Sequence, residues 1–162
     1  MSISKQEFAR RRKNLMALLE PGSIAIVPSA SLRTRSRDSD YPFRQDSDFF
    51  YLSGFDEPEA VLVLLPGRPQ GEYILFCRER DPAMELWDGY RAGPEGACAE
   101  YGADDAFPIA DIDDILPGLI EGRQRVYYAM GRHAEFDQQV MNWVNVIRSK
   151  GRSAGQPPGE FL

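Results

Sequence analysis

The fold of this chain is decided by residues 60–76, whose sequence is AVLVLLPGRPQGEYILF. Two apolar runs within it, 60–65 and 72–76, have the length and composition of buried strands. The segment between them, 66–71, is rich in proline and glycine, which is typical of a short turn connection. The sequence therefore predicts two neighbouring antiparallel strands.

Further strands and helices are predicted on both sides of this hairpin. The run 23–27 reads as a buried strand, and 126–129 is the next strand candidate. Ser4 followed by Glu7 is a capping-box pattern, which predicts a helix from Ser4 to the stop at Pro21-Gly22. Other helices are expected over 82–87, 94–101 and 135–149, and after a capping Asp111. Alternating helices and strands with one hairpin predict an α/β sandwich around a mixed sheet.

Residues 37–60 mix charged and aromatic side chains without helical or strand periodicity. A stretch so rich in Arg and Asp would ordinarily be a surface loop, yet its aromatic rings must be buried somewhere. Arg and Asp beside buried rings imply fixed ion pairs or a shaped site. We expect four side chains to organise this loop through ion pairs and backbone contacts: Arg44, Gln45, Asp48 and Tyr51.

Four motifs carry a family resemblance: Gln6 to Arg12, Tyr41 to Gln45, Gly54 to Leu64, and Glu85-Leu86-Trp87. Together they resemble the N-terminal domain of Xaa-Pro aminopeptidases (aminopeptidase P), in the creatinase and prolidase superfamily. The resemblance implies a ribonuclease-H-like α/β fold, a three-layer sandwich with helices flanking a mixed β-sheet. It also implies a division of the chain, with residues 1–150 forming the domain and 151–162, where periodicity is lost, starting a linker to a catalytic domain outside this chain.

The composition of the chain disfavours some classes of function. The chain has 162 residues and a formal net charge of -6, and its pI is about 4.9. This charge disfavours binding to nucleic acid or to an anionic membrane, both of which need clustered positive potential. Two cysteines make no disulfide framework, and Cys77 reads as a reduced, buried thiol. With no signal-like apolar run at its start, the chain is expected to be cytoplasmic.

The residues needed for hydrolysis are missing from the sequence. A metallopeptidase needs oxygen and imidazole ligands converging on a metal, but His133 is the one histidine and is expected to be structural or solvated. The acidic pairs at 104–105 and 111–114 lack the glycine and terminal glutamate of a calcium loop, which favours helix-capping and solvated roles. Family resemblance implies two divalent metal ions, manganese in particular, in the absent domain. We expect no catalytic residue and no metal ligand in this chain.

Three residues are candidates for substrate contact. Trp87, in the position of the family's Glu-Ile-Trp motif, could stack its indole against a proline ring, or could pack its helix onto its own domain. Asp38 matches an acidic position of the family and Arg152 lies near an interdomain arginine, so the two could latch the cleft or hold the peptide amine. The alternative for Asp38 is a role in folding its loop. Arg10 to Lys13 are expected to be solvated or ion-paired.

The leading hypothesis is a noncatalytic N-terminal domain of a metal-dependent Xaa-Pro aminopeptidase, which shapes the substrate cleft and forms subunit contacts. Its implied partners are its own catalytic domain, a peptide with proline second, and further copies in a tetramer or dimer. A prolidase acting on Xaa-Pro dipeptides is the runner-up. A stand-alone binding or oligomerisation module is an alternative from another class. A hydrolase using Asp38 and Asp40 is the least favoured, because a basic groove is lacking.

Overall fold

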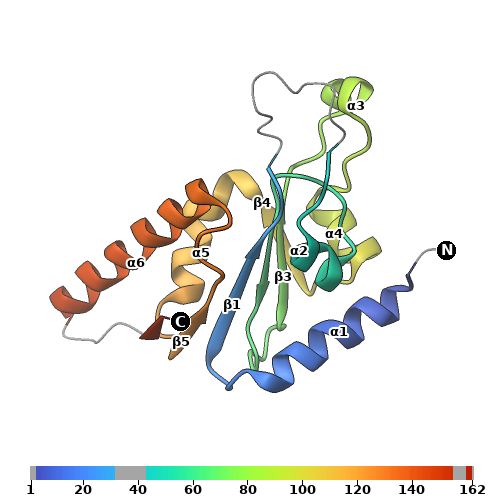
Figure 1. Ribbon diagram of the computed structural model, residues 1–162. Coiled ribbons are helices and arrows are strands. Elements are labelled where there is room, and N and C mark those ends of the chain that lie inside the picture. Colours follow the sequence, from blue (N-terminus) through green and yellow to red (C-terminus); the bar gives the residue numbers. More distant parts are fainter. Residues whose placement is uncertain (1–2, 32–42, 155–159, 162) are drawn as a thin grey trace.

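The computed structural model describes residues 3–31, 43–154 and 160–161, and this part of the chain forms a mixed β-sheet between two layers of helices (Figure 1). Its elements in chain order are α1 (Lys5–Leu18), β1 (Ser23–Pro28), α2 (Ser47–Ser53), β2 (Val61–Leu64), β3 (Tyr73–Cys77), α3 (Pro82–Asp88), α4 (Gly93–Tyr101), β4 (Asp105–Pro108), the 3-10 turn η1 (Ile109–Asp111), α5 (Ile112–Ile120), β5 (Arg125–Tyr127), α6 (Ala134–Ala154) and β6 (Glu160–Phe161). The strand order is β4-β3-β2-β1-β5-β6. The predicted three-layer α/β sandwich is confirmed.

The hairpin predicted from residues 60–76 lies inside the sheet. Strands β2 and β3 pair antiparallel, with Val61 opposite Phe76 and Leu64 opposite Tyr73. Strand β1 pairs antiparallel with β2 but parallel with β5, which makes the sheet mixed. Because these inner strands are covered on both faces, they read in the sequence as continuous apolar runs without alternation.

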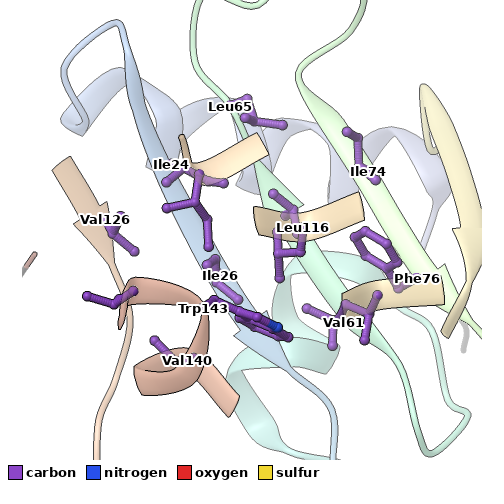
Figure 2. Packing of buried hydrophobic residues seen from close by; sticks show 14 of the residues in the cluster. Ile24, Ile26, Val61, Leu65, Ile74, Phe76, Leu116, Val126, Val140 and Trp143 are labelled. Atoms are coloured by element: carbon purple, nitrogen blue, oxygen red, sulfur yellow. The ribbon is translucent and has the colours of Figure 1, made fainter. Parts of the chain in front are cut away.

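Each face of the sheet has its own core. Side chains of Ile24 and Ile26 point to the face covered by α5 and α6, where Leu116 and Trp143 pack against them (Figure 2). Ala25, between those two isoleucines, belongs to the opposite core under α1, α2 and α4. This alternation follows from the two-residue period of a strand, since successive side chains point to opposite faces.

Helix α1 begins as predicted but differs on its charged face. The Ser4 hydroxyl accepts a hydrogen bond from the backbone N–H of Glu7 at 3.1 Å, so the predicted cap is confirmed. Arg10 and Arg11 both pair with Glu7. Arg12 is buried against the ring of Tyr73, with its guanidinium carbon 3.9 Å from the ring centroid, and within the part of the chain that the structure describes it forms no ion pair with a carboxylate. The predicted solvated or ion-paired role was therefore wrong for Arg12. The face of α1 that packs on the sheet is broader than the stripe of apolar residues in its sequence indicates.

Two elements lie where no strand was predicted. Strand β4 pairs parallel with β3 at the edge of the sheet, and its half-buried sequence, residues 105–108, carries too little apolar pattern to be recognised. Strand β6, which lies within the predicted linker, pairs parallel with β5. It has only two residues, which are too few to show the alternating pattern by which a strand is predicted. Helix α6 also continues through Ala154, beyond the predicted end at Ser149. Residues 151–162 therefore contain secondary structure, although the division into domain and linker stays a prediction.

Two of the acidic residues at 104–105 and 111–114 make hydrogen bonds to distant parts of the chain, which is a more specific role than the one predicted. Asp104 accepts hydrogen bonds from the backbone N–H groups of Glu72 and Tyr73, both at 3.0 Å. Asp113 accepts one from the indole N–H of Trp143 at 2.9 Å and so joins α5 to α6. Asp111 makes no side-chain cap bond, because the turn η1 leads directly into α5 there. The helix starts after Asp111 as predicted, with Asp111 at its N-cap position, but the side chain does not supply the expected cap bond.

Candidate functional site

The protrusion, which we define as residues 79–92, is the segment that stands out most from the body of the fold. It joins β3 to α4, carries the short helix α3 and extends past the end of the sheet (Figure 1). Its apolar side chains lie on the surface: Trp87 is 86% exposed and Leu86 is 84% exposed, and Tyr90 is also exposed. Large exposed apolar side chains that gather on one segment mark a site of interaction.

Local sequence explains why α3 forms at this place. Asp81 caps the helix by accepting a hydrogen bond from the backbone N–H of Met84 at 3.3 Å. Pro82 follows as the first helical residue, where its fixed φ angle suits the helix and its missing N–H is not needed. Gly89 ends the helix with a φ of 95°, a conformation that strongly favours glycine. The helix is thus specified at both ends although it buries no residue.

Glu85 closes the neck of the protrusion. One carboxylate oxygen accepts a hydrogen bond from the backbone N–H of Arg91 at 2.9 Å, and the other accepts one from the backbone N–H of Asp81 at 3.0 Å. The Arg80 side chain donates to the same carboxylate at 3.1 Å. The Glu85 side chain is only 9% exposed. The backbone N–H of Arg91, followed by the Arg80 guanidinium, lowers the pKa of Glu85.

Glu57 fastens the base of the protrusion to the body. It is buried, and its carboxylate accepts a hydrogen bond from the backbone N–H of Ala92 at 2.9 Å. Its other oxygen lies 3.5 Å from the guanidinium of Arg78, and the side chains of this pair are 11% and 13% exposed. At that distance the contact is an ion pair rather than a well-formed hydrogen bond. Removing one partner of such a buried pair leaves a charge uncompensated.

Gln45 organises the loop that carries Glu57, as predicted. Its amide oxygen accepts hydrogen bonds from the backbone N–H groups of Ala30 and Asp46, at 2.8 and 2.9 Å. Its amide nitrogen donates to the carbonyls of Phe55 and Glu57, at 3.2 and 2.8 Å. One side chain therefore ties the end of β1 to the start of α2 and to the segment before β2.

Asp48 and Tyr51 lie on α2 and have partners in other segments of the chain. Asp48 pairs with Arg132, and Tyr51 stacks under Arg11, whose guanidinium carbon lies 4.3 Å from the ring centroid. The ion pairing predicted for Asp48 is confirmed, whereas for Tyr51 the structure shows a cation–π contact with α1 instead of the predicted kind of contact. Arg44 is exposed, and its role stays a prediction.

Of the three predicted substrate contacts, the structure describes one side chain. Trp87 lies exposed on α3, so the alternative in which it packs its helix onto its own domain is not what the structure shows. Asp38 lies outside the described residues, as does Asp40. Arg152 belongs to the last turns of α6, where the backbone alone is described. The sequence analysis did not predict that Glu57 and Glu85 anchor the protrusion. For Glu85, the nearby arginines Arg80 and Arg91 were the signal in the sequence that could have indicated this role.

The described residues contain no group of three or more His, Cys, Asp and Glu side chains that could hold a metal ion. The ring nitrogen Nε2 of His133 lies 3.1 Å from a carboxylate oxygen of Asp46. Asp46 also caps α2 through the backbone N–H of Phe49, so this histidine contacts a structural carboxylate. Among the described helices, none is both long and apolar enough to cross a membrane.

A cleft of about 500 Å³ opens where β1 ends, between the first turns of α5 and α6. Its polar lining includes Asp113 and His133, which already bond to Trp143 and Asp46 respectively. The cleft therefore offers fewer available polar groups than its lining suggests, and the protrusion remains the stronger candidate site.

Comparison with known proteins identifies close relatives over almost the whole chain. Residues 8–127 match the family described as aminopeptidase P, N-terminal domain. The Xaa-Pro aminopeptidase of Escherichia coli K12 is 42% identical over 161 residues, which are 99% of this chain and 36% of that protein. Xaa-Pro aminopeptidase 3 of Homo sapiens is 35% identical, over 93% of this chain and 32% of its own length.

Solved structures agree with the sequence matches. The Pseudomonas aeruginosa aminopeptidase PepP is 66% identical and superposes with a TM-score of 0.92, covering 99% of this chain and 36% of that one. Zinc-substituted E. coli aminopeptidase P in complex with product is 40% identical with a TM-score of 0.90, over 100% of this chain and 37% of that one. The chain thus spans about a third of the length of these relatives.

Proposed function

Because the chain belongs to the aminopeptidase P N-terminal domain family, we propose that it is the noncatalytic part of an enzyme that removes the first residue from peptides having proline second. The relatives named Xaa-Pro aminopeptidase support this proposal. The observation that carries it is the protrusion, which presents exposed apolar side chains on and beside a helix held by polar bonds. In this proposal the domain shapes the substrate cleft, and chemistry takes place elsewhere in the parent protein.

The metal ions of the parent, which we propose to be two manganese ions, require ligands from outside the described residues. This follows from the donor set, since no described group of His, Cys, Asp and Glu converges as a divalent site requires. When bound, such ions would activate the water that attacks the peptide bond. No step of that chemistry is assigned to a residue of this chain.

Trp87 is the proposed contact with the proline ring of the substrate. An indole is flat and has few rotatable bonds, so stacking on a rigid pyrrolidine ring has a low entropic cost. Its 86% exposure leaves the face of the ring accessible to a ligand or to a neighbouring subunit. Asp38 and Arg152 are proposed to contribute a charge-assisted pair near the peptide amine.

The proposed partners are the catalytic domain of the same protein and further copies in a dimer or tetramer. Exposed rings on the protrusion favour such a contact, because a monomeric surface seldom gathers large apolar side chains without one. The net charge of -6 supports the expectation that nucleic acid is not a partner. A cytoplasmic location, expected from the sequence analysis, is also proposed.

The test is release of the first amino acid from an Xaa-Pro-Yaa tripeptide with manganese present. The 162-residue chain is compared with the parent protein extended to its natural end. We expect activity in the extended protein alone. Activity in the shorter chain would refute the noncatalytic assignment, and silence in both would favour a binding module. A parent that cleaves Xaa-Pro dipeptides but not tripeptides would instead be a prolidase.

A further inference from the structure

We propose that Glu85 is a positioning residue that fixes the direction of Trp87, and thereby sets how tightly the parent enzyme holds peptides with proline second. This inference rests on the proposed function, in which Trp87 contacts the substrate. It assigns to Glu85 an effect on substrate recognition although its own carboxylate is turned toward the neck of the protrusion.

Burial does not hold α3 in place. The helix has no buried residue, and its largest apolar side chains, Leu86 and Trp87, are more than four-fifths exposed. A helix of seven residues is also too short to be stable by its own hydrogen bonds. The position of Trp87 must therefore depend on the polar contacts that attach α3 to its surroundings.

Glu85 binds both ends of the segment that carries α3. It accepts hydrogen bonds from the N–H groups of Asp81, where the helix starts, and of Arg91, after the helix has ended. A single carboxylate thus closes the loop that carries α3. Charge-assisted bonds of this kind are about twice as strong as neutral ones, and here three donors share one acceptor group with Arg80 as the third.

Successive residues of an α-helix are turned by about 100° around its axis, so positions two apart lie on nearly opposite sides. Glu85 faces the neck, and Trp87 therefore faces away from the fold, in agreement with its exposure. Freeing the carboxylate would let α3 rotate, and the indole would lose its direction before any substrate binds.

The neighbouring contacts restrain the base of the protrusion but do not replace Glu85. Glu57 holds the backbone N–H of Ala92, and the Tyr90 hydroxyl donates to Glu100 at 2.8 Å. Both contacts lie on the side that returns to α4. Within the described residues, the hydrogen bonds that join the two sides of the neck directly are those of Glu85 and one from the Arg91 side chain to the carbonyl of Glu79.

The experiment is a double-mutant cycle in the full-length parent enzyme, with Glu85→Ala, Trp87→Ala and both together. KM and kcat are measured on an Xaa-Pro-Yaa tripeptide. We expect Glu85→Ala to raise KM about tenfold, the effect of losing roughly 1.4 kcal/mol of binding, and to leave kcat within about twofold. In the Trp87→Ala background the same change should leave KM nearly unaltered, because the ring that Glu85 positions is gone.

A more conservative variant and a matched control complete the design. Glu85→Gln keeps one acceptor oxygen and should give a KM between those of Glu85→Ala and the natural enzyme. Glu7→Ala removes a carboxylate that also binds two arginines but lies on α1, and it should leave KM unchanged. Faster amide hydrogen exchange at Arg91 in Glu85→Gln would show the opened neck directly.

The outcomes separate this inference from the function on which it rests. If Trp87→Ala leaves KM unchanged, the proposed substrate contact is wrong and the inference falls with it. If Trp87→Ala raises KM but Glu85→Ala multiplies KM equally in both backgrounds, the substrate contact stands and the positioning role is refuted. A fall in kcat with unchanged KM in Glu85→Ala would also refute it.

Discussion

At the scale of single residues, polar side chains fix the segments that hydrophobic burial cannot. Gln45 joins four backbone groups from three segments, and Glu85 closes a neck whose helix buries nothing. A backbone N–H or carbonyl taken from water must find a partner, which is why one well-placed side chain can determine the path of a loop. Both residues lie in motifs quoted for the family resemblance.

We predict that Gln45→Glu lowers the free energy of unfolding of this chain by about 2 to 3 kcal/mol. The change removes the two bonds donated to Phe55 and Glu57 and turns a negative charge toward their carbonyls. Urea unfolding followed by circular dichroism measures the difference. Gln138→Glu, on the exposed side of α6, is the matched control and should change stability by less than about 0.5 kcal/mol. Equal effects would show that charge alone is responsible.

At the scale of elements, close approach between helices depends on a residue without a side chain. Gly54 ends α2 in the left-handed conformation with a φ of 69°. A Cβ atom there would lie 2.5 Å from a ring carbon of Phe8, so α1 and α2 could not keep their present contact. The sequence shows a glycine shortly after an aromatic run, but the ring that excludes a side chain there belongs to α1, which is far away in the sequence.

We predict that Gly54→Ala destabilises the chain by about 2 to 5 kcal/mol, since backbone strain and overpacking act together. Gly122→Ala is the control, because Gly122 also has a positive φ, 82°, but faces open space. It should cost only the strain, about 1 to 2 kcal/mol. Thermal unfolding of both variants gives the comparison. A loss no larger in Gly54→Ala than in Gly122→Ala would contradict the packing argument.

At the scale of the whole molecule, the sheet buries ionisable groups between its two helical layers. Burial raises the pKa of the Cys77 thiol from 9.0 to about 12, and burial also raises the pKa of Tyr73 well above its usual value. Both groups belong to β3 and to the core under α1, α2 and α4. The folded chain therefore retains protons at alkaline pH that the unfolded chain releases.

We predict that stability falls as the pH rises from about 9 to about 12. The pKa of Cys77 is higher in the folded chain than in the unfolded chain. Its contribution to the free energy of unfolding is therefore complete below the unfolded pKa of 9.0 and is lost as the pH rises toward the folded pKa of about 12. One such group changes the free energy of unfolding by at most about 1.4 kcal/mol per pH unit. The melting temperature measured across this range tests the sign. Cys77→Ala should show a shallower alkaline decline, and an identical decline would assign the effect to other groups.

Sequence alone determined the parts of this protein that depend on local pattern. The inner strands, the hairpin, the Ser4 cap and the amphipathic helix after residue 134 all follow from periodicity and capping chemistry. The family resemblance was carried by short motifs and is confirmed by the match over residues 8–127. Strands β4 and β6 could not be predicted, because edge strands are half-buried or short and need a neighbour to define them.

Tertiary structure alone decided which polar residues carry the candidate site. Glu57 and Glu85 are ordinary acidic residues in the sequence, and their importance comes from backbone N–H groups that the fold brings within 3.0 Å. Arg12 is a further example. Its helical pattern places it on a charged face, but in the folded chain it is buried against the ring of Tyr73. Periodicity reports the average environment of a face, whereas a hydrogen bond depends on the position of two atoms, and only the folded chain sets that position.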